Sequence, residues 1–132
     1  MNKAAIIIDP TLPLGILANA VACITSGLFL EGKDLVGSEI AGKEVTYIPI
    51  TKIPILILKP GEKSLVEILS QAQKVNLKYM AFTKEAQSTT DYDTYVERVT
   101  GKPVDSVSII GVGIVGPTKI INSLVGSLPM LR

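Results

Sequence analysis

The sequence contains no histidine and no tryptophan, and its 132 residues include a single cysteine, Cys23. Without histidine the chain lacks the commonest general base, the usual catalytic triads and most zinc sites. One cysteine excludes an internal disulfide and is typical of a reducing compartment, so we expect a cytoplasmic protein. Because no cluster of ligating side chains stands out either, we expect no metal and no cofactor.

Net charge and aromatic content are also low, at +1 and 5% respectively. The basic residues are scattered along the chain, so no patch favours nucleic acid or an anionic membrane surface. The few aromatic side chains offer little for stacking on bases. Composition alone therefore argues against nucleic acid as a partner.

The longest uncharged run, Leu12 to Leu30, is long enough to cross a bilayer. It contains Pro13, Gly15 and Asn19, however, and it has neither an aromatic belt nor a flanking basic cluster. Helices buried inside α/β domains have the same composition. We predict a buried helix and no association with a membrane.

Apolar, β-branched runs alternate with segments of helical periodicity throughout the chain. This pattern predicts strands over 4–8, 55–58, 77–83 and 104–115, and helices over 13–28, 62–75, 91–100 and 118–125. Thr11 is the expected N-cap of the first helix, and Gly116-Pro117 is expected to end the last strand. Segments 31–43 and 84–90 read as loops, and 44–54, with two prolines, as an edge or irregular β segment. The alternation predicts one α/β domain over 1–132, folded as a three-layer α/β/α sandwich.

Both ends of the chain carry a family resemblance. The segment Gly113-Ile-Val-Gly-Pro-Thr-Lys-Ile-Ile-Asn-Ser-Leu-Val-Gly126 resembles the closing strand and helix of type II peptidyl-tRNA hydrolases. Gly15-Ile-Leu-Ala-Asn-Ala-Val-Ala-Cys23 is similar to the glycine-led first helix of that superfamily. The chain is still more similar to a bacterial offshoot classed as a domain of unknown function. The resemblance implies a mixed, four-stranded central sheet and a homodimer.

The catalytic pattern of those hydrolases is not matched. They carry a lysine directly after the helix-opening glycine, where this chain has Ile16. Isoleucine can neither contact a phosphate nor polarise a carbonyl. Ala20 and Cys23 stand where the hydrolases have glutamine and histidine. The resemblance therefore implies the fold, whereas the activity does not carry over.

Asp9 and Asn19 are the first candidates for a ligand site. Asp9 follows the first strand, where open α/β sheets commonly bind ligands, although it can equally cap the following turn. Asn19 is a polar residue on an apolar helix and either bonds to nearby backbone or faces a cleft. Cys23, one turn later, reads better as a small buried hydrophobe than as a nucleophile, because no basic partner is available.

The glycines near the C-terminus have two interpretations. Gly111, Gly113 and Gly116 permit either close helix–sheet packing or the approach of a ligand to the backbone. The amides of Thr118 and Lys119 open the last helix and are available to an anion. The segment Thr89–Tyr95 holds the one polar-aromatic cluster, which reads as a surface helix start or as a cover over a pocket.

Two functional hypotheses follow. The first is a non-catalytic or regulatory module that binds a small polar ligand in a cleft at the carboxyl end of the first strand. Its candidate residues are Asp9, Thr11, Gly15, Asn19, Gly113, Gly116 and Thr118. The alternative is a divergent hydrolase of peptidyl-tRNA-like or acylated substrates, for which tRNA would be a partner. The sequence assigns no catalytic residue.

Overall fold

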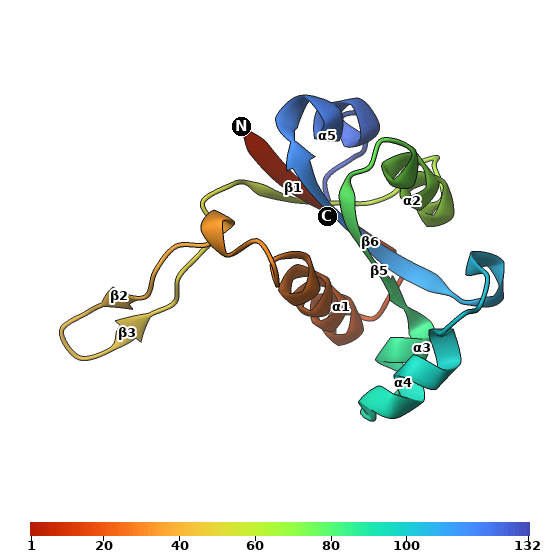
Figure 1. Cartoon of the computed structure of the whole chain (residues 1–132), viewed down its shortest axis with the longest axis horizontal. Coiled ribbons are helices and arrows are strands. Elements are labelled where there is room, and N and C mark those ends of the chain that lie inside the picture. Colours follow the sequence, from red (N-terminus) through yellow and green to blue (C-terminus); the bar gives the residue numbers. More distant parts are fainter.

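A computed structural model describes residues 1–132, and at its centre is a four-stranded sheet in the order β4-β1-β6-β5 (Figure 1). The strands are β1 (Asn2–Ile8), β4 (Ile55–Leu58), β5 (Lys78–Thr83) and β6 (Ile109–Pro117). β1 pairs in parallel with β4 and antiparallel with β6, which also pairs antiparallel with β5. The sheet is mixed, as predicted, and the two ends of the chain meet as its neighbouring central strands.

Helices lie on both faces of this sheet. One face is covered by α1 (Leu14–Leu28), and the other by α2 (Leu65–Lys74) and α5 (Thr118–Val125) (Figure 1). Two further helices, α3 (Lys84–Gln87) and α4 (Tyr92–Val99), follow β5. None of the helices combines the length and hydropathy that crossing a membrane requires.

The central strand β1 is buried from Ala4 to Ile8 because both of its faces are covered there. Its odd-numbered side chains Ala5 and Ile7 belong to the apolar cluster formed with α2 and α5. Ile6 and Ile8 point the other way and pack against Ala20 and Ile24 of α1. A strand covered on both faces needs no polar alternation, which explains why this segment reads as a continuous apolar run.

Two glycines of β6 bring α1 close to the sheet. A Cβ atom on Gly113 would lie 2.4 Å from Ile24 Cγ2, and one on Gly111 would lie 2.7 Å from Ile24 Cδ1. Either side chain would overlap the helix, so glycine is required for this spacing. Of the two interpretations open from the sequence, close helix–sheet packing describes these two positions.

Residues 36–51 form a hairpin that projects from the body beside α1, and we call it the arm (Figure 1). It follows a short 3₁₀ helix (Lys33–Leu35), and its strands β2 (Ile40–Ala41) and β3 (Thr46–Tyr47) pair antiparallel. At its base the Gly37 amide donates to the Ile50 carbonyl over 2.8 Å. The sequence predicted a loop followed by an irregular β segment here, without their pairing.

Capping differs from prediction at two helices. Thr11 is not the N-cap of α1, because Pro13 occupies that position and provides no side-chain hydrogen bond. α2 begins at Leu65 rather than 62, since the Ser64 hydroxyl accepts a hydrogen bond from the Glu67 amide. A hydroxyl that satisfies a first-turn amide fixes where a helix starts.

The regions around β6 also differ from prediction. Segment 84–90 is not simply a loop, because the Thr83 hydroxyl accepts from the Ala86 amide and starts α3. The last strand begins at Ile109 and follows a 3₁₀ turn at Val104–Ser106. It also continues through Gly116 and Pro117, which pair with Lys3 and Asn2 of β1.

Candidate functional site

An apolar groove opens between α1, β5 and α4, and we call it the α1–α4 groove. Its lining residues come from these three elements: Cys23, Ile24, Gly27, Met80, Ala81, Phe82, Tyr92 and Tyr95. Its volume is about 300 Å³. Sulfur, aliphatic and aromatic groups dominate the lining, so the groove favours an apolar surface over an ion.

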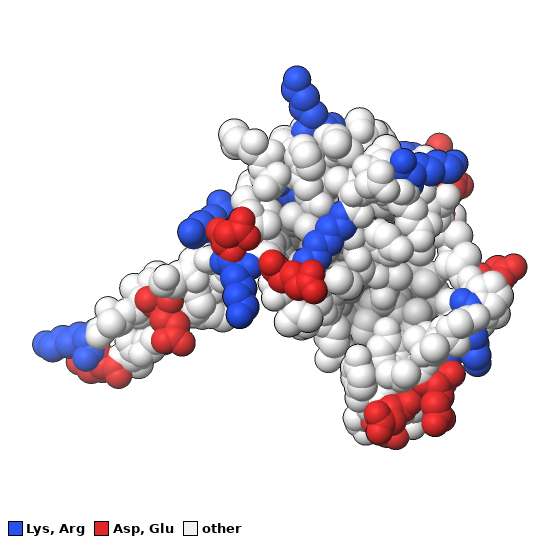
Figure 2. All heavy atoms as spheres, viewed as in Figure 1, with Lys and Arg blue, Asp and Glu red and all other residues white.

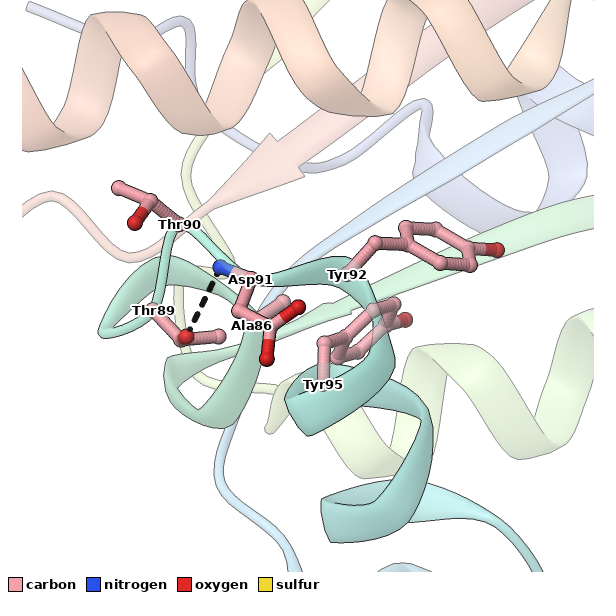
Figure 3. Close-up of a pocket in the computed structure, with 6 residues that line it drawn as sticks. All are labelled: Ala86, Thr89, Thr90, Asp91, Tyr92 and Tyr95. Carbon is pink, nitrogen blue, oxygen red and sulfur yellow. Dashed lines mark hydrogen bonds between the residues drawn. The ribbon is translucent and has the colours of Figure 1, made fainter.

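A second, smaller hollow of about 160 Å³ lies on the same two tyrosines, and Figure 3 shows the residues that line it. It shares Tyr92 and Tyr95 with the groove and adds polar groups from Thr89, Thr90 and Asp91. The two tyrosine rings stand edge to face, with centroids 6.0 Å apart. Together the hollows form an apolar floor with a polar end, which is the usual composition of a small-molecule site.

Local hydrogen bonds place Tyr92 and Tyr95 on this wall. The Asp91 carboxylate accepts from the Asp93 amide and from the Thr94 hydroxyl, and so caps the first turn of α4. The Thr94 hydroxyl holds the pKa of the Asp91 carboxyl below its ordinary value, an effect opposed by partial desolvation. The cap is therefore charged at neutral pH and complements the helix dipole.

The far end of α4 is tied to α3. The guanidinium of Arg98 donates to the Glu85 carbonyl and to the Ser88 hydroxyl, each over 3.1 Å. The Glu85 carboxylate in turn accepts from the Ser108 amide over 2.7 Å, just before β6. These bonds fix α4 to α3 and α3 to the segment before β6, so the tyrosines hold a defined position in the wall of the groove.

Asp9 forms a local turn. Its Oδ1 atom accepts hydrogen bonds from the Thr11 amide over 2.9 Å and from the Thr11 hydroxyl over 2.7 Å. This is the capping interpretation that the sequence left open. A hollow of about 390 Å³ lies beyond this end of β1, and it is lined by Pro10, Leu12, Leu14, Leu17, Leu131 and Arg132. The predicted residues Asp9, Thr11 and Gly15 are not among those that line it.

The seven predicted site residues do not share one place, and the predicted cleft between Asp9 and the glycine corner is therefore corrected. Antiparallel pairing puts Ile8 opposite Gly111 but Lys3 opposite Gly116, so Asp9 and Gly116 lie at opposite ends of β1. The sequence did not reveal that β1 and β6 run in opposite directions. Beside Gly116, the amide and hydroxyl of Thr118 both donate to the Met1 carbonyl, so that amide is not free for an anion.

Asn19 and Cys23 lie one turn apart on the exposed side of α1. The Cys23 thiol is 3.8 Å from Asn19 Oδ1, a weak hydrogen bond. Cys23 is exposed and lines the groove, so its prediction as a buried hydrophobe is wrong. Asn19 does not line the groove. No three acidic or cysteine side chains come close enough together to hold a metal ion.

The whole of residues 2–132 matches the family model described as a protein of unknown function, DUF2000. The chain belongs to the DUF2000 family. A solved structure of similar fold is that of Atu0240, a protein of unknown function from Agrobacterium tumefaciens strain C58. The two are 16% identical over 99% of this chain and 98% of the other, with a TM-score of 0.88. A search of the curated proteins gives no match.

Membership of DUF2000 confirms the resemblance to a family of unknown function, while the groove itself was missed. In the sequence of this DUF2000 chain, Cys23 was considered separately from the pair Tyr92 and Tyr95. Their meeting depends on α4 folding back over α1 and β5, which no local pattern encodes. The available signal was the i, i+3 spacing of the tyrosines, which puts both rings on one helix face.

Proposed function

We propose that this DUF2000 protein is a non-catalytic module that binds a small ligand in the α1–α4 groove. The observation that supports this is the groove itself, whose mostly apolar lining includes Tyr92, Tyr95 and Cys23. Its volume of about 300 Å³ is at the lower end of the range for small-molecule sites. The proposal keeps the predicted function but moves the ligand away from Asp9.

The lining indicates the chemistry of the ligand. Met80 and Phe82 suit a flat aromatic or aliphatic body, since thioether and ring contacts are adaptable and apolar. Thr89 and Thr90 in the adjoining hollow suit a neutral polar group at one end. A compact amphipathic molecule therefore fits better than the strongly polar ligand expected from the sequence. Regulation would follow if binding changes how α4 sits on the body.

A divergent hydrolase remains the alternative proposal. Ile16 stands where the resembling hydrolases carry lysine, and Oδ1 of the Asp9 carboxylate accepts two hydrogen bonds from Thr11. These two facts favour binding over catalysis. Release of peptide from peptidyl-tRNA, abolished by Asp9→Asn, would support the hydrolase instead.

A thermal-shift screen tests the binding proposal. Small amphipathic compounds, amino acids and nucleotides are screened for a rise in melting temperature, because a ligand of the native state stabilises it. The stabilising compound should also slow alkylation of Cys23 by iodoacetamide, since Cys23 lines the groove and is the single thiol. Tyr92→Ala should weaken binding by about tenfold, the loss of one good aromatic contact.

Tyr79→Ala is the matched control, because Tyr79 bonds to Gln73 and does not line the groove. It should leave the affinity unchanged. The binding proposal fails if no compound stabilises the protein, or if the stabilising compound leaves the alkylation rate of Cys23 as it was.

For the fold, we propose the three-layer sandwich of the type II peptidyl-tRNA hydrolase-like superfamily. The support is the mixed sheet with α1 on one face and α2 and α5 on the other. Gly15 in the first turn of α1, and the chain's ending on the strand β6 followed by the helix α5, also support the proposal. Superposition on an experimental structure of such a hydrolase, with the same strand order, is the direct test.

A further inference from the structure

The two edges of the central sheet differ in what covers them. At the β4 edge, a short extended segment near the end of the chain lies alongside the strand. The Lys59 amide donates to the Pro129 carbonyl over 3.0 Å. The Leu131 amide donates to the Ile57 carbonyl over the same distance, and the Leu131 side chain packs on the α1 side of the sheet. Extended chain therefore already closes one edge by backbone pairing.

The opposite edge, β5, has no such cover. β5 pairs only with β6, and none of the hydrogen bonds made by turns, loops and caps involves the backbone of residues 78–82. In an antiparallel pair, every second residue directs both its N–H and its C=O group away from its partner. The outward groups of β5 are therefore free to pair with another extended segment.

The α1–α4 groove includes this open edge. Met80 and Phe82 direct their side chains to the α1 side, whereas the Ala81 side chain packs on the opposite side with the α2 and α5 cluster. Ala81 nevertheless lines the groove, so it contributes its backbone there. Met80 and Phe82 are only half-buried, because no further strand lies beside them. The groove thus joins an unpaired backbone edge to an apolar floor.

We propose that β5 binds an extended peptide segment of a partner protein, in which apolar and polar residues alternate. The peptide pairs antiparallel with β5, as Met130 does with Leu58 at the other edge. Its apolar side chains then enter the groove, and the residues between them pass over Tyr79 on the α2 side. In this mode backbone pairing provides affinity and the pocket provides selectivity. The inference rests on the proposed function, because the peptide occupies the same groove.

Charges at the two ends of β5 indicate the direction of the peptide. Lys74 and Lys78 lie at the end where the strand begins. At the other end, α4 and its cap carry Asp91, Asp93 and Glu97, and Figure 2 shows acidic side chains gathered where Figure 1 places α4. An antiparallel peptide has its N-terminal end beside α4. A basic residue there and an acidic residue at its C-terminal end are therefore complementary to this edge.

Hydrogen exchange of the β5 amides tests the pairing on the wild-type protein. The probes are short synthetic peptides, blocked at both ends, in which threonine alternates with phenylalanine, leucine or valine between an N-terminal lysine and a C-terminal glutamate. At saturation, the bound peptide should slow exchange of every second amide over 78–82 by at least about tenfold, and the amides paired to β6 should be unaffected. It should also slow alkylation of Cys23, which lines the groove.

Peptides N-methylated at every second residue are the matched controls, because they keep every side chain and remove chosen donors. Only alternate amides of a paired strand face β5. One of the two N-methylated sets should therefore bind at least about tenfold more weakly, and the other should bind like the parent peptide. Equal effects of the two sets would overturn the pairing. Exchanging the terminal lysine and glutamate should weaken binding about twofold to fivefold, and tighter binding would overturn the antiparallel direction.

The remaining outcomes distinguish this inference from the proposed function. A small compound that stabilises the protein and protects Cys23, while no peptide slows the β5 amides, would overturn the peptide and leave small-ligand binding in place. A peptide that slows the β5 amides, while no compound stabilises the protein, would support the edge and remove the small-ligand proposal alone. Outward amides that are already slow in the protein alone, and become fast on dilution, would show that a second copy covers β5, which would also overturn the peptide.

Discussion

Gly15 and Gly113 are the same residue type in opposite surroundings. Substituting each by alanine therefore distinguishes the cost of packing from the effect of helix propensity on stability. A Cβ on Gly113 would lie 2.4 Å from Ile24 Cγ2, and Ile24 is a buried, β-branched residue with little freedom to move. We predict that Gly113→Ala lowers the free energy of unfolding by about 1–3 kcal/mol, the usual cost of overpacking. Urea denaturation followed by circular dichroism measures this.

Gly15→Ala is the control for the same chemical change. Gly15 is exposed in the first turn of α1, and nothing lies within 4 Å of a Cβ placed there. Alanine should therefore be neutral or raise the free energy of unfolding by up to about 1 kcal/mol. Equal destabilisation by both variants would show that β6 does not approach α1 as closely as described.

At the scale of elements, α4 depends on a titrating cap. Thr94 donates to the Asp91 carboxylate and lowers its pKa, so the charged form is preferred when α4 is folded. A lowered pKa means that this contribution is present above the ordinary carboxyl pKa, about 4, and is lost as the pH falls through the lowered value. NMR titration of the Asp91 carboxyl, alongside α4 chemical shifts, should show both changes with one midpoint.

Two variants check the cause of that pH dependence. Thr94→Val removes the hydroxyl and should raise the midpoint towards the ordinary carboxyl value. Asp91→Asn keeps an oxygen that can accept from the Asp93 amide but cannot titrate, so the α4 shifts should become independent of pH in this range. Wild-type α4 shifts that stay unchanged while the Asp91 carboxyl titrates would argue against a role for the charge in capping.

The elements that the sequence predicted well are those whose signal is local. The strand over 55–58 agrees with β4, and the helix over 118–125 agrees with α5, because each has a clear apolar period and flanking breakers. The arm was missed because its pairing joins a polar stretch, 38–43, to a proline-containing one. α3 was missed because four residues give no period, only the cap at Thr83.

The predicted cleft between Asp9 and the glycine corner was right only in fragments, since it depends on the relative direction of β1 and β6. Asp9 was correctly placed at the carboxyl end of β1, and the glycines were correctly placed on the last strand. Antiparallel pairing then put Gly116 beside Lys3, at the wrong end for a shared cleft. Strand direction is a long-range property, and a single sequence without contacts carries little information about it.

At the scale of the whole molecule, the two apolar layers share one strand, so they should unfold together. Ile6 faces α1 and Ile7 faces α2 and α5, and both are 0% exposed. Ile6→Ala and Ile7→Ala each leave a cavity in a different layer, at a cost of about 2–5 kcal/mol. Because both cavities open next to β1, we predict a single unfolding transition in each variant, with the layers losing structure at the same urea concentration.

Two probes distinguish one cooperative unit from two. Circular dichroism follows all helices, whereas the NMR signals of the α1 backbone amides report on the α1 side alone, and the two unfolding curves should coincide for both variants. Val66→Ala, at a 42% exposed position on α2, should change the free energy of unfolding by less than about 0.5 kcal/mol. If Ile7→Ala loosened only α2 and α5 while α1 kept its midpoint, the layers would be independent, and β1 would not couple them.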